Sequence, residues 1–219
     1  MSPYQNLRVT IVLQTPMVEP KDLLHLDAVL GSLKVSEAKA KLGEGINPRD
    51  YHHELPLARH ESKAGWVFKA SALRLKAEVR ENQMQTSRIN LAEAAEHRKS
   101  GWLNSRPNRA NIAGGPFKTS LYYVPTALGE LTAYCVGDKS QIERLLTRCK
   151  QVGGRRGTGH GRVKSIQVEV VDAGECDWSD RNMPIDSTGL GRTHVLGVST
   201  LNAPYWDRTL HERVLLPTK

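Results

Sequence analysis

Residues 138–170 read DKSQIERLLTRCKQVGGRRGTGHGRVKSIQVEV and combine a helix, a glycine-rich loop and a strand in one run. Asp138 and Gln141 have the spacing of a capping box at a helix N-terminus. Apolar residues then recur at helical spacing: Ile142, Leu145, Leu146, Cys149 and Val152. This stripe predicts a helix that ends at the glycines 153–154. The alternation of apolar and polar residues over 166–170 predicts a strand after the loop.

The same periodicities predict the remaining core elements on the N-terminal side of this run. Apolar and polar residues alternate over 7–13, which is typical of a strand with one buried face. Leucines at intervals of three and four over 23–33 predict a helix. Alternation returns over 67–80, a long strand with a charged outer face. Residues 122–136 contain two apolar segments around a turn at 125–129, so they form either a strand pair or one interrupted strand.

The predicted elements follow the order of a ferredoxin-like, RRM-like βαββαβ domain: strand, helix, strand, insertion, strand, helix, strand. We therefore predict an α+β fold in which two helices cover one face of an antiparallel sheet. This domain spans 1–171, and a basic excursion at about 81–117 interrupts it. Residues 43–64 lack periodicity and are expected to form a loop, whereas 172–219 form a β-rich extension packed on the same domain. The open sheet face is a common place for RNA to bind.

The charge distribution indicates a polyanionic partner. The chain has 31 lysines and arginines against 23 acidic residues, a net charge of +8 and an isoelectric point of about 9.5. Residues 144–164 contain only basic charges: Arg144, Arg148, Lys150, Arg155, Arg156, Arg162 and Lys164. Residues 172–186 have the opposite character, with five acids against Arg181 alone. One face of the protein should therefore attract phosphate.

The loop GGRRGTGHGR, residues 153–162, has five glycines, three arginines and a histidine. Glycine allows positive φ and close approach of a ligand to the backbone, and arginine binds phosphate through two hydrogen bonds. A nucleotide cofactor is disfavoured, because the loop runs from a helix into a strand and lacks the Gly-Lys pair of a P-loop. The alternative is a flexible helix end with solubilising charges.

We predict RNA-binding residues in this loop and in the basic excursion. The loop set is Gly153, Gly154, Arg155, Arg156, Gly157, Thr158, Gly159, His160, Gly161, Arg162 and Lys164. The excursion set is Lys99, Trp102, Arg106, Arg109 and Lys118. In the second set the indole of Trp102 is the best candidate for stacking on a base, while Tyr205 and Trp206 are expected to serve packing.

These features resemble the RAMP superfamily of CRISPR systems, in which a ferredoxin-like unit carries a glycine-rich, arginine-bearing loop. The segments LRVTIVLQTP (7–16), DLLHLDAVLGSL (22–33) and PYWDR (204–208) are further similar to the Cas-five-type subunit of type IV complexes. The resemblance implies a subunit that caps the five-prime handle of a guide RNA and contacts backbone and large subunits. It also implies that loop 153–162 touches handle phosphates and that the excursion forms a thumb. Target DNA is a further candidate partner.

Catalysis is the main alternative, because some RAMP proteins cut repeat RNA without a metal. Such chemistry needs a general base near a 2′-hydroxyl and a cation near the phosphate. His160 lies among arginines, and His25, His52 and His53 are other candidates. Each has a simpler role in phosphate contact, packing or a loop, so we predict no catalytic residue. A metal-independent endoribonuclease that processes CRISPR repeat RNA and a ribosome- or tRNA-associated RNA binder stay open.

No metal or other cofactor is expected, because the histidines and carboxylates lack ligand spacing. Cys135, Cys149 and Cys176 fit neither a disulfide framework nor a zinc motif, which favours reduced, structural cysteines. The N-terminal residues 1–13 have no long apolar segment of a signal peptide, and no later segment approaches the ~20 apolar residues of a membrane span. The sequence therefore predicts a cytoplasmic protein that does not bind membranes.

Overall fold

The computed structural model of the chain describes residues 4–52, 54–87, 96, 99–100 and 120–218. The chain forms two compact units. The larger contains Met1–Val79 and Ala127–Lys219, and the smaller contains Arg80–Thr126. The smaller unit includes the predicted basic excursion, most of which lies outside the described residues. The predicted domain boundaries at 171 and 172 stay a prediction.

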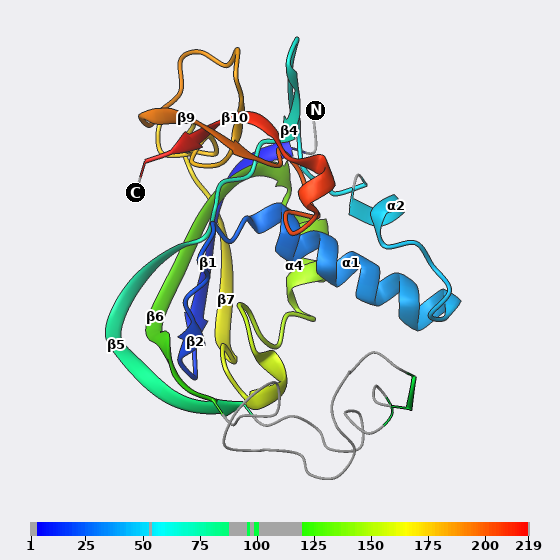
Figure 1. Cartoon of the computed structure of the whole chain (residues 1–219). Helices are drawn as coiled ribbons and strands as arrows, with labels where there is room; N and C mark the ends of the chain where they lie inside the picture. The colour runs from blue at the N-terminus through cyan, green and yellow to red at the C-terminus, as the bar shows by residue number, and fades with distance from the viewer. Residues whose placement is uncertain (1–3, 53, 88–95, 97–98, 101–119, 219) are drawn as a thin grey trace. The chain divides into compact units, whose positions relative to one another are not determined.

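The main sheet has five strands: β1 (Tyr4–Leu13), β2 (Met17–Val18), β5 (Arg74–Ser87), β6 (Ser120–Asp138) and β7 (Val163–Val170). β1 is central and pairs antiparallel with β6 and with β7, while β5 and the short β2 also pair with β6 (Figure 1). In this register Val9 lies opposite Ala133 on one side and Val168 on the other. Apolar residues of three strands therefore meet on one face of the sheet.

Two helices cover that face, α1 (Leu26–Leu42) and α4 (Lys139–Leu146). Leu7, Val9 and Ile11 of β1 are fully buried against Leu30 of α1 and Ile142 of α4. The first strand and the first helix predicted from periodicity are thus confirmed. The α+β class is confirmed as well, with mainly antiparallel strands.

Helix α4 begins as predicted but is shorter. The Asp138 side chain accepts a hydrogen bond from the backbone N–H of Gln141, which is the predicted N-cap. The helix ends at Leu146, and the prediction that it continues to the glycines is wrong. The backbone N–H of Val152 donates instead to the carbonyl of Gly161, at 2.9 Å, so this residue already belongs to the base of the loop. Cys149 and Val152 are buried as the stripe predicts, but outside the helix.

Two strand predictions are corrected as well. The predicted strand 67–80 is divided into β4 (Gly65–Phe68) and β5, because residues 69–71 bond to β6: the N–H of Ser71 donates to the Tyr134 carbonyl. β6 is one strand of 19 residues, with no separate turn at 125–129. The predicted loop at 43–64 contains two further short elements, α2 (Arg49–His52) and β3 (Arg59–Ser62), and β3 pairs with β4.

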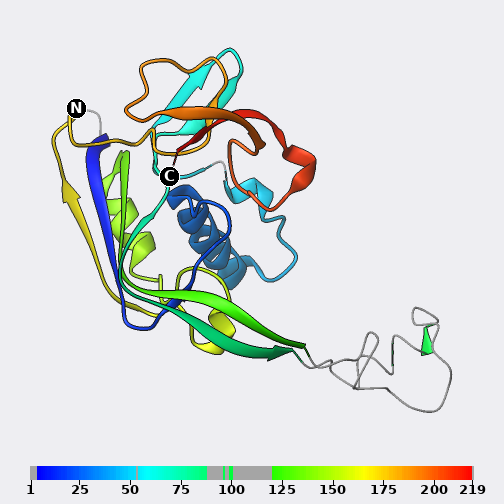
Figure 2. The same cartoon turned by 60° about the vertical axis from the view of Figure 1, so that its left-hand side comes forward.

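The C-terminal part of the chain forms a second small sheet in the order β8, β10, β9. Its elements are β8 (Met183–Pro184), β9 (His194–Ser199), the short helix η3 (Arg208–Leu210) and β10 (Glu212–Pro217). Met183, Leu201 and Val214 form a separate apolar cluster with Val67 of β4. This sheet and the glycine-rich loop lie at opposite ends of the larger unit (Figures 1 and 2).

Arg181 joins the two parts of the larger unit. Its guanidinium is completely buried, forms an ion pair of 3.2 Å with Asp27 of α1, and donates to the Phe68 carbonyl at 2.8 Å. It also donates to the Leu201 carbonyl and to the Tyr205 hydroxyl, both at 2.6 Å. One side chain thus links the start of α1, the end of β4 and the C-terminal segment. The acidic character of residues 172–186 gave no indication of this role.

Candidate nucleic-acid interface

The glycine-rich loop connects α4 to β7 and contains the short helix η2 (Arg156–Thr158). The segment between β1 and β2 holds its second half. The N–H of Gly161 donates to the Pro16 carbonyl at 2.9 Å, and the N–H of Gln14 donates to the Arg162 carbonyl at 2.7 Å. The Thr15 hydroxyl bonds both to the Gly159 carbonyl and to the N–H of Arg162. The loop therefore has a fixed base on the core sheet.

The glycines of the loop have different roles. Gly153, Gly159 and Gly161 have φ angles of +82°, +88° and +65°, which favour glycine. A Cβ at Gly161 would also overlap the Val152 carbonyl oxygen, whereas a Cβ at Gly157 would meet open space and no strained φ. Gly161 is therefore needed for the loop's conformation, and Gly157 is not.

Internal hydrogen bonds give the exposed part of the loop a defined turn. The Thr158 hydroxyl donates to the Arg155 carbonyl at 2.8 Å and lies 3.0 Å from Nδ1 of His160. The Gln151 side chain donates to the Arg156 carbonyl at 2.8 Å. Arg155 itself has a positive φ of 53°, which is uncommon for a residue other than glycine. Sequence reasoning missed Gln151, because an isolated glutamine before a glycine pair has no distinctive pattern.

The basic cluster is smaller than its seven residues suggest. Glu37 of α1 forms ion pairs with Arg144 at 3.0 Å and with Arg148 at 4.0 Å. Hydrogen bonds from Lys41 and then from Arg144 hold the pKa of the Glu37 carboxyl below its usual value, so this acid is charged at neutral pH. Arg144 and Arg148 therefore share one carboxylate, which Lys41 also approaches at 3.1 Å, so this acid offsets a single positive charge of the cluster. The contact comes from another element and is not visible in the local sequence.

The other basic residues form the exposed surface of the loop. Lys150, Arg156, Arg162 and Lys164 are exposed and make no ion pair with any residue in the described part of the chain. Arg155 is exposed as well. The first four charges, which have no carboxylate partner among the described residues, keep their full attraction for phosphate, and Arg155 adds a fifth exposed basic side chain to the loop. We call these five residues the loop cations.

A shallow pocket of about 400 Å³ lies beside the loop cations. Lys164 of β7 and Glu78 of β5 line it together with Gln14, which also anchors the loop. Its remaining lining comes from Val12, Leu13, Leu128 and Gly129. The pocket therefore combines one loop cation, Lys164, and one acid, Glu78, with an apolar floor.

The structure brings the loop residues predicted from sequence together, from Gly153 to Arg162 with Lys164. Of the predicted excursion residues the structure describes Lys99. Lys99 is exposed and belongs to the smaller unit. Trp102, Arg106, Arg109 and Lys118 lie outside the described residues.

The open sheet face offers little to RNA. Arg8 of β1 lies on this face, opposite Tyr134 of β6 and Glu169 of β7. Its guanidinium forms ion pairs with Glu169 at 2.7 Å and with Glu175 at 2.8 Å. These two acids raise the pKa of Arg8 and cancel its charge on this face. Around Arg8 this face is therefore not basic, which makes the loop the better candidate.

The histidines considered for catalysis have packing or loop positions. His25 is 2% exposed and stacks on Tyr205 with ring centroids 4.1 Å apart. Burial, followed by the nearby Arg181 and Arg74, lowers its pKa well below the usual value, so the ring is neutral. His160 lies beside Thr158 in the loop, His52 belongs to α2, and His53 lies outside the described residues.

The cysteines and acids show no metal site in the described part of the chain, where no group of three or more His, Cys, Asp or Glu side chains has a suitable arrangement. All three cysteines are free and buried, and burial raises the pKa of each thiol. Among the described helices none is long and apolar enough to cross a membrane.

Comparison with known proteins gives the family. No curated protein matches the chain. A chain in the cryo-EM structure of the Type III-B Cmr-beta bound to cognate target RNA is similar, with a TM-score of 0.40 and 11% identity over 76% of this chain. The match spans 61% of that chain's length. The family described as CRISPR type IV associated protein Csf3 matches residues 5–217, nearly the whole sequence. The chain therefore belongs to the Csf3 family of type IV CRISPR-associated proteins.

Proposed function

We propose that this protein is a non-catalytic guide-RNA-binding subunit that caps the five-prime handle of the crRNA in a type IV effector ribonucleoprotein. The observation that carries the proposal is the arrangement of the loop cations. Five exposed basic residues lie in the loop or directly beside it, and the base of the loop is fixed on the core sheet. A fixed backbone with exposed arginines suits phosphate, because little conformational freedom is lost when the phosphate binds.

The strand order supports a RAMP-type fold. β5 pairs with β6, β6 with β1, and β1 with β7, and the helices α1 and α4 cover one face. This is the pairing expected for a ferredoxin-like βαββαβ unit. The loop then lies between the second helix and the last strand of the unit, where the RAMP resemblance expects it. The Cas-five-type assignment and the thumb at 81–117 belong to this proposal.

The absence of catalysis is also a proposal. The proposal is supported by the position of His160, whose Nδ1 lies 3.0 Å from the hydroxyl of Thr158 within the turn of the loop, which suits a structural role of the ring in the loop. The alternative, a metal-independent endoribonuclease acting on CRISPR repeat RNA, would need His160 or another base to reach a 2′-hydroxyl. We further propose that the protein is located in the cytoplasm. Its proposed protein partners are the backbone and large subunits of the effector complex, and target DNA is a further candidate partner.

The test measures binding of a repeat-derived RNA by fluorescence anisotropy. Arg155→Ala and Arg156→Ala should each weaken binding about fivefold or more, because each removes a charged phosphate contact of ~1 kcal/mol. The matched control is Arg144→Ala, which removes a cation of the same sequence cluster that is already paired with Glu37. Equal affinity of all three variants and the unmodified chain would contradict the proposal.

Cleavage separates the two functions. The unmodified protein, incubated with repeat RNA in EDTA, should leave the RNA intact. Specific cleavage that disappears in His160→Ala would establish the endoribonuclease instead. Handle specificity is checked with a repeat RNA that lacks its five-prime handle, which should bind more weakly than the complete guide RNA.

A further inference from the structure

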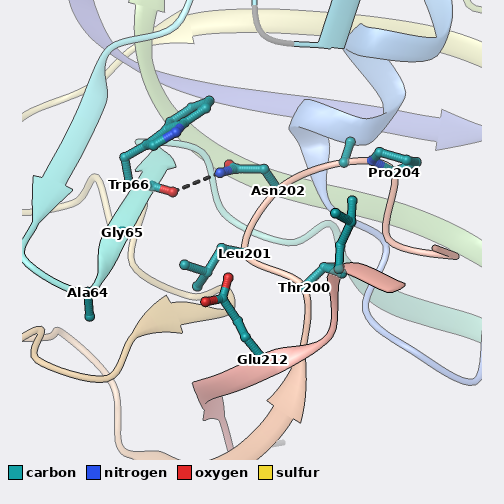
Figure 3. Close-up of a pocket in the computed structure, with 10 residues that line it drawn as sticks. Ala64, Gly65, Trp66, Thr200, Leu201, Asn202, Pro204 and Glu212 are labelled. Atoms are coloured by element: carbon teal, nitrogen blue, oxygen red, sulfur yellow. Dashed lines mark hydrogen bonds between the residues drawn. The ribbon is translucent and has the colours of Figure 1, made fainter. Parts of the chain in front are cut away.

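A second pocket lies in the C-terminal part of the larger unit, away from the glycine-rich loop. It has a volume of about 340 Å³ and lies between the β3–β4 turn and the segment from β9 to β10 (Figure 3). Its apolar lining includes Ala64, Leu201, Ala203, Pro204 and Leu210. Gly65, Trp66, Thr200, Asn202 and Glu212 complete it. The walls are thus mainly apolar, with a few polar groups.

Two side-chain oxygens of this pocket, from Thr200 and Asn202, have no hydrogen-bond partner among the described residues. Thr200 is 1% exposed, and its hydroxyl has no hydrogen-bond partner among the described residues. The Asn202 amide nitrogen donates to the Trp66 carbonyl at 2.7 Å, which leaves the buried Oδ1 of Asn202 without a partner in the same part of the chain. A buried oxygen without a partner costs about 1–3 kcal/mol, so a ligand that donates to it would be favoured.

Glu212 adds a negative charge to the pocket. Figure 3 shows its carboxylate directed toward Leu201. This side chain is exposed and forms no ion pair with the described residues. The protein has a net charge of +8, yet no basic side chain of the described residues neutralises this carboxylate. RNA phosphate would be repelled here, whereas a cation would be attracted.

These properties define the occupant. Two unpartnered oxygens and a carboxylate require several N–H donors with a positive charge, and the apolar walls require an aliphatic stem. A guanidinium has five N–H donors in a fixed plane, on a side chain that buries its methylenes along apolar surface. The three N–H donors of lysine are all on one nitrogen, so a lysine would reach the separate oxygens of this pocket less well than an arginine.

We propose that this pocket receives an arginine side chain from a partner protein. The surroundings fit a protein surface: Leu210, on the rim, is 44% exposed, and Trp206, between Pro204 and Leu210 in the sequence, is 79% exposed. The expectation that Trp206 serves packing is therefore not met within this chain. Tryptophan is one of the residues that most often dominate the binding energy of protein interfaces, so an exposed one in this segment fits a protein partner. The proposal does not depend on RNA binding by the loop.

The test uses the full chain and an amide-resolved NMR titration with Nα-acetyl-arginine amide. Amide signals of residues 64–66 and 200–203 should shift and saturate. Nα-acetyl-citrulline amide, which has nearly the same shape without the charge, should bind at least fivefold more weakly. Glu212→Gln should weaken arginine binding about fivefold, and Glu143→Gln, an exposed acid on α4, should leave it unchanged.

Thr200→Val distinguishes a ligand site from a structural one. Valine has nearly the shape of threonine but lacks the unpartnered hydroxyl, so the variant should keep or gain thermal stability and lose arginine affinity. Lower stability with unchanged affinity would overturn the proposal. So would equal binding of the arginine and citrulline probes, no binding of either, or a shift of the same amide signals by RNA. Arg155→Ala should leave the titration unchanged, which separates this result from the fate of the proposed RNA function.

Discussion

Gly161 and Gly157 lie four residues apart in the same loop but differ in what a side chain would meet. Gly161→Ala places a Cβ against the Val152 carbonyl and on a residue with a φ of +65°. We expect a loss of at least ~1 kcal/mol in the free energy of unfolding, from the φ alone. Gly157→Ala should stay within about 0.5 kcal/mol of the unmodified chain. Urea unfolding measures both variants.

A comparable loss in the two variants would mean that the backbone of the loop is not fixed as described. RNA binding gives an additional readout: Gly157→Ala should keep its affinity, because its Cβ would point into open space. From the sequence, the five glycines look equivalent and predict only a loop with freedom at positive φ. The structure shows that Gly161 needs this freedom because it bonds to Pro16 and Val152. Neither contact follows a regular sequence spacing, so the sequence alone does not reveal it.

Helix α4 depends at its start on the charge of Asp138. The carboxylate accepts hydrogen bonds from the Ser140 hydroxyl at 2.7 Å and from the N–H of Gln141 at 3.1 Å. The Ser140 bond first, and the Gln141 bonds next, hold the pKa of Asp138 below its usual value of 3.8. Since the folded pKa is the lower one, the charged cap stabilises the fold above pH 3.8, and this contribution is lost as the pH falls through the folded pKa.

Asp138→Ala should therefore destabilise the protein at pH 7, and its difference from the unmodified chain should shrink below the usual aspartate pKa. Urea unfolding over a series of pH values checks this. Asp138→Asn is the matched control, because an asparagine can cap the helix at every pH. A difference between the alanine variant and the unmodified chain that stays constant down to pH 2 would show that the carboxylate charge is not involved.

Elements with strong local patterns could be predicted from the sequence. β1 alternates between apolar and polar residues over most of its length, and its predicted inward residues Leu7, Val9 and Ile11 are completely buried. The Asp138 cap is equally local. The predictions failed where hydrogen bonds to residues outside the local segment set the boundaries of an element. β4 and β5 are separate strands because the residues between them bond to β6, and α4 ends early because Val152 pairs with Gly161. Periodicity detects which residues are buried, but hydrogen-bond partners decide which element contains them.

At the scale of the whole molecule, Arg181 forms hydrogen bonds with six residues from several segments of the larger unit. Arg181→Met would leave the buried Asp27 without its cation and would remove the donor from several carbonyls. We expect a loss of about 3 kcal/mol or more in the free energy of unfolding. Tyr205→Phe removes only the hydroxyl that links the same two groups, and should cost about 1 kcal/mol. Urea unfolding ranks the two variants.

If Arg181→Met unfolds at the same urea concentration as the unmodified chain, the buried pair is not what holds the C-terminal segment to α1. The sequence could not predict this role. Arg181 is the single basic residue in an acidic run, a context typical of a solvated surface. Its partners come from α1, β4 and the segment after β9, which only the tertiary structure brings together.

If the protein binds RNA as proposed, the attraction should depend on the cations that have no acidic partner among the described residues. Arg144 and Arg148 share Glu37, whereas Arg156 and Arg162 have no carboxylate partner in the described part of the chain. RNA affinity should therefore fall as salt rises, because phosphates bound by free cations release their counterions. Arg156→Ala and Arg162→Ala should each reduce the slope of log K against log salt by about 0.7, the value for one contact to a single strand. Arg144→Ala should leave the slope nearly unchanged. If all three variants reduce it equally, the ion pairs with Glu37 do not restrain these arginines, and the full sequence cluster binds RNA as one basic surface.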